Sequence, residues 1–313
     1  MNSRRIFLEY SALTAGMLLL PGGLLQLGCT SKISHIKISL AQWSLHRALA
    51  KGDVKADDFP FIAKNTYGIN AVEYVNQFFT EKATDESYWL DLKRRCDDEG
   101  IISLLIMVDD EGHLGNPNSG ERIKAVEKHY KWVHAAKMLG CHSIRVNAFG
   151  QGSKAAIRSA LVDGMGRLAE YAASEEINIL IENHGLQSSD GAYIAGIIQE
   201  VDNPYLGTLP DFGNWCLNAE WGSTNNNACT EIYDPYQGLM DFMPYAKGVS
   251  AKSYDFDADG NETTINYPKL LQLVKDQGYD GYIGIEYEGS RLSESEGIMA
   301  TKELLERTWA TLS

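Results

Sequence analysis

The feature that most constrains the fold is the alternation of short apolar segments with amphipathic ones along most of the chain. Eight segments rich in β-branched and aliphatic residues recur at intervals typical of strands separated by helices. Most are continuously apolar, as expected for parallel strands that are buried on both faces. They are Ile36–Ala41, Ala71–Val75, Ser103–Val108, Ser143–Ala148, Asn178–Glu182, Leu206–Pro210, Gly248–Lys252 and Tyr282–Glu286.

Between these segments the apolar residues follow the spacing of amphipathic helices. The pattern predicts helices over Glu86–Asp98, Glu121–Leu139, Ala155–Ala173, Pro235–Phe242, Tyr267–Gln277 and Glu294–Leu312. Residues 214–230 show no such pattern and predict a long loop. Eight strands alternating with helices over roughly 250 residues predict a single α/β domain, a (β/α)8 TIM barrel. An open doubly wound sheet is the alternative, but the glycine-rich turn expected after its first strand is replaced by Gln42–His46.

The first 31 residues differ from the rest of the chain. Arg4 and Arg5 precede a short apolar run, which ends near Gly28 and Cys29. This order is typical of an export signal of the twin-arginine type. We therefore expect an exported, periplasmic protein whose barrel covers residues 32–313, with Cys29 as a site for a lipid anchor. Gln26 stands where lipoprotein signals carry an aliphatic residue, and a frayed helix is the alternative for the whole segment.

Charge and cysteine spacing exclude several classes of function. The net charge of −14 would repel nucleic acid, so we expect no nucleic-acid partner, although DNA-cleaving enzymes share the predicted fold. Beyond Cys29, the four cysteines show no zinc-binding spacing. Cys216 and Cys229 could form a disulfide in an oxidising compartment. Free buried thiols are the interpretation that we favour from the sequence.

Carboxylates stand at the strand ends where a (β/α)8 barrel places its active site. Glu182 ends the fifth strand, Asp211 follows the sixth and Glu286 ends the eighth. Of Glu286 and Glu288, we expect only the former to point inward. Carboxylates that converge on one barrel mouth repel one another unless a cation neutralises them. An oxygen-rich ligand set favours a divalent metal such as Mn²⁺ or Mg²⁺, with Zn²⁺ or Co²⁺ as further options.

Other polar residues at the strand ends are candidates for binding and catalysis. The candidates for catalysis are His184, Lys252 and Arg145 beside the glutamates, and those for substrate binding are Trp43, His46, Asn147, Asn183 and Asn214. Structural roles are the alternatives. Glu182 could form a salt bridge, Asp211 could cap a turn, and Trp43 could belong to the core.

Four segments at these strand ends resemble the sugar phosphate isomerase/epimerase family, the xylose-isomerase-like TIM barrels. They are Leu180–Gly185, Leu209–Asn214, Val249–Lys252 and Ile283–Gly289. The resemblance implies that Glu182, Asp211 and Glu286 hold a metal. It places Ser250 where the family has a histidine ligand, and Asn214 where it often has a second histidine. The metal site would then consist of the three carboxylates alone, bind its metal more weakly, or be completed by His184 or by the substrate.

The resemblance also implies removal of a proton next to a carbonyl group, which gives an enediolate. Glu182 and Glu286 would act as base and acid, with Lys252 and Arg145 stabilising the enolate oxygen and His184 as an additional base. Residues 253–259 are acidic, which disfavours a phosphate group, so we expect a small unphosphorylated sugar or keto-sugar as substrate. The leading hypothesis is a metal-dependent sugar isomerase/epimerase. The alternatives are a lyase that cleaves 3-keto-glycosides and a non-catalytic sugar-binding barrel.

Overall fold

The computed structural model describes residues 35–226 and 228–312, and the predicted leader with Arg4, Arg5 and Cys29 lies outside them. All eight predicted strands are confirmed to within one residue at either end. They are β1 (Lys37–Ala41), β2 (Ala71–Val75), β3 (Ile102–Val108), β4 (Ser143–Asn147), β5 (Asn178–Glu182), β6 (Leu206–Leu209), β7 (Val249–Ser253) and β8 (Tyr282–Tyr287).

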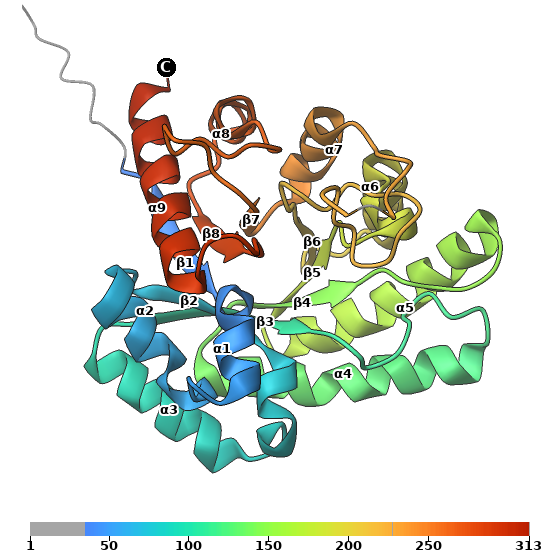
Figure 1. Cartoon of the computed structure of the whole chain (residues 1–313). Helices are drawn as coiled ribbons and strands as arrows, with labels where there is room; N and C mark the ends of the chain where they lie inside the picture. Colours follow the sequence, from blue (N-terminus) through green and yellow to red (C-terminus); the bar gives the residue numbers. More distant parts are fainter. Residues whose placement is uncertain (1–34, 227, 313) are drawn as a thin grey trace, which may run out of the picture. The chain divides into compact units, whose positions relative to one another are not determined.

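The strands form one parallel sheet in the order β6-β5-β4-β3-β2-β1-β8-β7. Two isolated parallel bridges, Thr208–Ala246 and Asp211–Ser250, join its two edges. The backbone nitrogen of Ser250 donates to the oxygen of Pro210 at 2.9 Å, and that of Phe212 donates to the oxygen of Ser250 at 3.0 Å. The sheet is therefore closed into the predicted (β/α)8 barrel, with the helices around the strands (Figure 1).

Helices connect successive strands on the outside of the barrel. They are α1 (His46–Lys51), α2 (Phe59–Tyr67), α3 (Glu86–Asp98), α4 (Ser119–Leu139), α5 (Lys154–Ser174), α6 (Gly191–Val201), α7 (Pro235–Phe242), α8 (Tyr267–Asp276) and α9 (Glu294–Thr311). Short 3-10 helices lie at Gln42–Leu45, Ala56–Asp58, Asn76–Lys82, Leu186–Ser189 and Met243–Tyr245. Within the described part of the chain, no helix combines the length and the apolarity needed to span a membrane.

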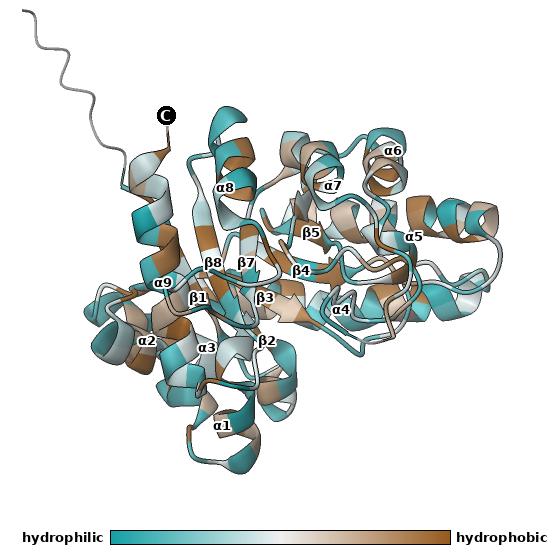
Figure 2. Ribbon diagram, turned by 45° about the horizontal axis from the view of Figure 1, so that its top comes forward, coloured by the Kyte–Doolittle hydropathy of each residue, from teal (hydrophilic) through white to brown (hydrophobic). Residues whose placement is uncertain are grey.

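The apolar residues form two separate groups. The larger one lies between the strands and the inner faces of the helices, where the ribbon is hydrophobic, while the outer helix faces are hydrophilic (Figure 2). A smaller buried group contains Val75, Leu105, Met107, Leu180 and Leu209 from the strands. Because residues two apart on a strand share a face, Leu180 and Glu182 point to the same side of β5. An apolar layer inside the barrel thus lies beneath a polar mouth.

Candidate metal and sugar site

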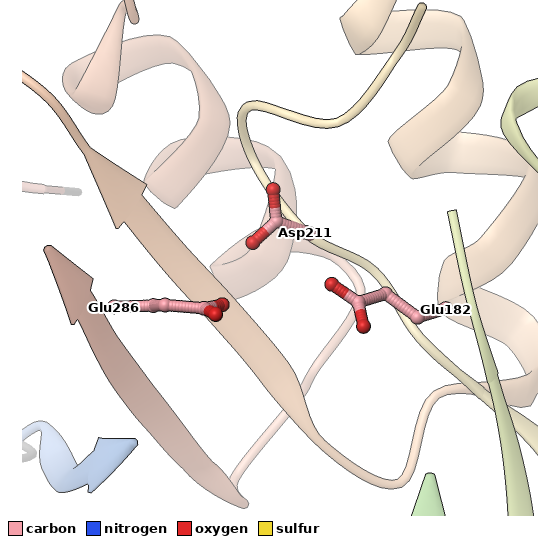
Figure 3. Close-up of side chains that lie close together, drawn as sticks. All are labelled: Glu182, Asp211 and Glu286. Carbon is pink, nitrogen blue, oxygen red and sulfur yellow. The ribbon is translucent and has the colours of Figure 1, made fainter. Parts of the chain in front are cut away.

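The structure brings the three carboxylates of Glu182, Asp211 and Glu286 together. One oxygen from each lies within 4.8 Å of the others, and all three residues are buried. Glu182 and Glu286 extend toward one another from β5 and β8, and Asp211 lies on the segment after β6 (Figure 3). This convergence follows directly from the positions of the three residues at parallel strand ends.

Ser250 occupies the place where the resemblance puts a histidine ligand. Its hydroxyl lies 2.5 Å from Oδ2 of Asp211 and 2.9 Å from Oε2 of Glu286. A hydroxyl has one proton and can donate to only one of these oxygens, so the other contact needs a proton on a carboxyl group. Burial raises the pKa of Asp211 well above its ordinary value and that of Glu286 to about 7. Without a metal, the pair can therefore retain a proton near neutral pH.

Lys252 is a fully buried cation beside this cluster. Its Nζ lies 3.2 Å from Oδ1 of Asn214, 3.4 Å from Oε1 of Glu288 and 3.8 Å from Oε2 of Glu286. Burial alone would lower the pKa of Lys252, but the neighbouring carboxylates outweigh burial and hold this pKa well above its ordinary value. Lys252 is therefore a permanent positive charge at the mouth.

Arg145 provides the second buried cation and contacts the opposite side of the cluster. Its Nη1 lies 2.5 Å from Oδ1 of Asp109, and its Nε lies 2.8 Å from Oε2 of Glu182. Asn214 donates to the other oxygen of Glu182 at 3.2 Å. Burial nevertheless raises the pKa of Glu182, since it outweighs the attraction of Arg145 and Lys252. Arg145 and Asn214 thus fix the carboxyl group in position.

His184 is held as a neutral imidazole with a defined tautomer. Asn147 donates through Nδ2 to Oδ1 of Asp109 at 2.7 Å, so its Oδ1 is the acceptor that lies 2.7 Å from Nδ1 of His184. Nδ1 therefore carries the proton and Nε2 is left as an acceptor. Burial and the charge of Arg145 lower the pKa of His184 to about 3. His184 can accept a proton or a hydrogen bond only through Nε2.

The charges at the mouth fit a divalent cation. The carboxyl groups there outnumber the cations Arg145 and Lys252; they are those of Glu73, Asp109, Glu182, Asp211, Glu286 and Glu288. Mutual repulsion adds to burial in raising the pKa of Asp211 and of Glu286. Three converging oxygens without sulfur suit an oxygen-preferring ion such as Mn²⁺ or Mg²⁺. The residues present therefore fit the metal that the sequence predicts.

A cavity of about 310 Å³ opens above this cluster, and we call it the catalytic cavity. Its lining includes Arg145, His184, Glu286 and Trp43, all of which were predicted from the sequence. Asn147 lies beside it through its bond to His184.

His46 and Asn183 do not line the catalytic cavity. His46 binds the backbone oxygen of Trp43 through Nδ1, and Asn183 donates to the backbone oxygens of Asp211 and Asn214. Both residues hold neighbouring segments in place, so a direct contact with substrate stays a prediction for each.

Glu288 was expected to point away from the mouth, and this expectation is wrong. It lines the catalytic cavity together with Glu286 and contacts Lys252. The reason is the strand period of two, which places residues 286 and 288 on the same side. The alternation of the strand was therefore sufficient to find Glu288.

Trp221 also lines the catalytic cavity, and no sequence pattern indicated it. It lies in the predicted long loop between β6 and α7, where no periodicity relates a residue to the barrel. Cys216 and Cys229 form a disulfide across this loop, with their Cα atoms 5.8 Å apart. Our preference for free thiols is therefore wrong for this pair and is confirmed for Cys96 and Cys141, which are free and buried.

Comparison with known proteins identifies a family and several relatives that resemble this chain. The family model of the xylose isomerase-like TIM barrel matches residues 62–308. A Homo sapiens protein named "Putative hydroxypyruvate isomerase" is 26% identical over 171 residues, which span 50% of this chain and 57% of the human protein. The match thus covers little more than half the length of that relative.

Two further proteins show similarity of different kinds. The C-glycoside deglycosidase alpha subunit of Arthrobacter globiformis is 36% identical over 72 residues, 22% of this chain and 20% of that protein. The crystal structure of a 3-keto-D-glucoside 4-epimerase from E. coli superposes with a TM-score of 0.61 at 14% identity, over 87% of this chain and 99% of that one. At this identity the superposition supports the fold alone. The match of the family model over most of the chain shows that the protein belongs to the xylose isomerase-like TIM barrel family.

Proposed function

We propose that the protein is a metal-dependent isomerase or epimerase of an unphosphorylated sugar or keto-sugar. The observation that carries the proposal is the pair of buried glutamates from β5 and β8, whose oxygens converge with that of Asp211 within 4.8 Å. Burial raises the pKa of both Glu182 and Glu286, the latter to about 7. Two buried carboxyl groups with raised pKa values supply the base and the acid that such a reaction needs.

The remaining residues of the mouth have roles that fit proton abstraction next to a carbonyl group. A divalent metal held by Glu182, Asp211 and Glu286 would polarise the carbonyl oxygen of the substrate. The guanidinium of Arg145 and the ammonium of Lys252 would stabilise the negative charge that develops on oxygen. Nε2 of His184 is an acceptor in the same cavity and serves as an additional base or as an anchor for a sugar hydroxyl.

The surroundings of the catalytic cavity favour a substrate without phosphate. The loop after β7 carries Asp255, Asp257 and Asp259, and the nearby Arg291 is paired with Asp255 at 2.6 Å. Lys252 is likewise surrounded by carboxylates. Neither cation is left to bind a phosphate group, whereas carboxylates and amides suit sugar hydroxyls. The export predicted for residues 1–31 is consistent with such a substrate and stays a prediction.

Deuterium exchange tests the proposal. The protein is incubated in heavy water with D-fructose or with methyl 3-keto-β-D-glucoside, in the presence of Mn²⁺, Mg²⁺, Zn²⁺ or Co²⁺. We expect deuterium at the carbon next to the carbonyl group, followed by formation of an isomer or epimer.

Glu182→Gln and Glu286→Gln should lower the exchange rate by at least about a hundredfold. Glu303→Gln, at an exposed position of α9, is the matched control and should leave it unchanged. Absence of exchange with both sugars and all four metals would contradict the proposal.

A second candidate, a lyase, is favoured by the local similarity to a deglycosidase subunit. The first step would be the same proton abstraction, but the enolate would then expel the C1 substituent of a 3-keto-glycoside, which leaves with the bonding electron pair and takes up a proton. The methyl glycoside separates the two reactions, since a lyase releases methanol. Methanol release without formation of an epimer would support the lyase over the isomerase.

A further inference from the structure

A second cavity of about 290 Å³ adjoins the catalytic cavity. The two cavities share Asp110 and Trp221 as lining residues. The second cavity is formed by the segments after β3 and β4 and by the loop that carries Trp221. Its lining includes His113, His129 and Glu220, none of which lines the catalytic cavity. The structure therefore has two adjacent compartments with a common border.

Both residues at this border have a backbone conformation that side chains other than glycine rarely adopt. The φ angle is 61° at Asp110 and 63° at Trp221. Such conformations cost energy and persist where the surrounding structure imposes them, often at functional sites. The Cys216–Cys229 disulfide and the antiparallel bridge between Gly185 and Glu220 hold the Trp221 loop in place. The backbone that carries Trp221 is thus held in place by the fold.

Trp221 offers an aromatic surface at this border. It is 45% exposed, which is unusual for a tryptophan that a loop holds in place. Its ring packs edge-on against His184 at 5.0 Å and Phe149 at 5.8 Å between ring centroids. These contacts fix the orientation of the indole and leave part of it accessible. An accessible and fixed indole is suited to stacking against a flat or sugar ring.

The polar groups of the second cavity are mainly hydrogen-bond acceptors. Asp110 and Glu220 contribute exposed carboxylates. His129 is 3% exposed and donates through Nδ1 to the oxygen of Ala125 at 2.7 Å, which leaves Nε2 as an acceptor with no partner among the described residues. No lysine or arginine is among the described residues that line this cavity. The cavity therefore suits a ligand that donates hydrogen bonds and carries no negative charge.

We propose that the second cavity is a subsite for a second, hydroxylated ring of the substrate, so that the enzyme acts on glycosides. The inference rests on the proposed function, because the reacting sugar ring would occupy the catalytic cavity. Each cavity has the volume of a small ligand pocket, roughly 300 Å³, which suits one ring in each. The second ring stacks on Trp221, and its hydroxyl groups donate to Asp110, Glu220 and Nε2 of His129. It is either a sugar or a hydroxylated aromatic group.

Three 3-keto-β-D-glucosides test the inference, with methyl, D-glucosyl or 4-hydroxyphenyl as the C1 substituent. The readout is kcat/KM for deuterium exchange by the full chain with Mn²⁺. We expect the two-ring compounds to be preferred over the methyl glycoside by at least about tenfold.

Trp221→Ala should reduce this preference about tenfold, and Trp221→Phe should retain most of it. Leu90→Ala, at a residue that is 50% exposed on α3, is the control and should leave the preference unchanged. The glucosyl and hydroxyphenyl arms show which kind of ring the subsite takes.

Equal kcat/KM for one-ring and two-ring compounds would overturn the inference. An equal loss for all three compounds in Trp221→Ala would also overturn it, since Trp221 would then only position His184. If no compound exchanges deuterium, the proposed function fails and the subsite is tested by binding alone. Calorimetry would then compare methyl β-D-glucoside, cellobiose and 4-hydroxyphenyl β-D-glucoside. Tighter binding of a two-ring compound that is lost in Trp221→Ala supports the subsite, and equal binding of all three contradicts it.

Discussion

At the scale of single residues, Ser250 has the largest consequence for the site. It replaces a potential ligand with a hydroxyl that bridges Asp211 and Glu286. The two carboxyl groups are thereby coupled through one proton, and burial raises the pKa of each. A metal ion that enters the site must displace that proton, so metal binding and protonation compete.

This competition predicts a pH dependence of metal affinity. The pKa of Glu286 is about 7 in the metal-free protein, so the group is mostly protonated at pH 6 and mostly ionised at pH 8. The apparent affinity for Mn²⁺ should therefore fall about tenfold from pH 8 to pH 6 through this group alone. Calorimetry in buffers of different ionisation enthalpy would measure both the affinity and the proton release. Glu286→Gln should bind more weakly and lose this part of the pH dependence. Equal affinities at the two pH values would contradict the coupling.

The buried charge of Lys252 leads us to expect that the free energy of unfolding depends on whether a metal is bound. This buried ammonium lies 3.4 Å from Glu288, which is half-buried, and 3.8 Å from Glu286, which is buried. Lys252→Met should lower the free energy of unfolding of the metal-free protein by about 3–5 kcal/mol, because it leaves buried carboxylates uncompensated. Mn²⁺ should then restore more stability to the variant than it adds to the wild type.

Urea denaturation with and without Mn²⁺ measures both effects of Lys252→Met. Lys128→Met, at an exposed position of α4, is the control for loss of a lysine. A loss below about 1 kcal/mol in Lys252→Met, or an equal gain from Mn²⁺ in both proteins, would show that the cation does not balance the cluster.

At the scale of elements, the loop between β6 and α7 is the part of the site that depends least on the barrel. It runs from the barrel at Asp211 to the N-terminus of α7, where Asp234 caps the helix by accepting from the backbone nitrogens of Tyr236 and Gln237. The Cys216–Cys229 disulfide closes its central part. Trp221 therefore owes its position to covalent closure of the loop as well as to packing.

Loss of the disulfide should loosen this loop. A closed loop of about 15 residues is expected to contribute about 3 kcal/mol, so the double variant Cys216→Ser/Cys229→Ser should lose up to that amount. Urea denaturation and limited proteolysis measure the loss and show whether cleavage falls within residues 217–228. Dithiothreitol should destabilise the wild type in the same way and leave the double variant unaffected. No effect of the reductant on the wild type would contradict the prediction.

The elements that the sequence predicted are those with a strong period. The long amphipathic helices α4 and α5 and all eight strands were found, because burial on the barrel imposes a regular apolar spacing. Helices α1, α2 and α6 were missed. Helix α1 has six residues, none of them buried, α2 contains Pro60 near its start, and α6 contains Gly191 and Gly196 among β-branched residues. Their stability comes from packing and caps that no local pattern reveals.

The residues of the site that lie at strand ends could also be predicted from the sequence, whereas those in the irregular loop could not. Glu182, Asp211 and Glu286 follow from the rule that parallel strands end at one barrel mouth. Trp221 was not found, and the Cys216–Cys229 disulfide was named only as the less favoured alternative, because an irregular loop has no period that relates its residues to the barrel. The roles of Asn183 in binding backbone and of Asn214 in binding Glu182 and Lys252 depend on three-dimensional contacts alone.

At the scale of the whole molecule, the barrel interior changes from apolar to acidic along its axis. Glu73 of β2 lies among the residues of this transition. It accepts a hydrogen bond from Ser39 at 2.6 Å, and its Oε2 has no hydrogen-bond partner among the described residues. A Cβ atom at Gly284 would lie 2.5 Å from Oε1 of Glu73, so glycine in β8 makes room for this carboxyl group. Burial is the main cause that raises the pKa of Glu73 to about 7, and the charges of Glu286 and Glu182 add to it while the hydrogen bond from Ser39 opposes it.

The raised pKa of Glu73 therefore leads us to expect that the free energy of unfolding of the metal-free barrel depends on pH. Its pKa is about 7 in the folded protein and 4.5 as the ordinary value, so between these values the folded state holds a proton that the unfolded state has lost. The stabilisation is complete below pH 4.5 and is lost as the pH rises through 7. The proton on Glu73 thus contributes about 3 kcal/mol to the free energy of unfolding at low pH.

Urea denaturation of the metal-free wild type and of Glu73→Gln between pH 5 and pH 8 measures this contribution of Glu73 to the free energy of unfolding. Asp211 and Glu286 act in the same direction and are present in both proteins, so their contributions cancel in the difference apart from the interaction of Glu286 with Glu73 itself. The wild type should lose on the order of 3 kcal/mol more than Glu73→Gln across this range, while Glu303→Gln should follow the wild type. Parallel curves for wild type and Glu73→Gln would mean that Glu73 is ionised in the folded barrel throughout. Its charge would then have to be balanced by a contact other than the one with Ser39.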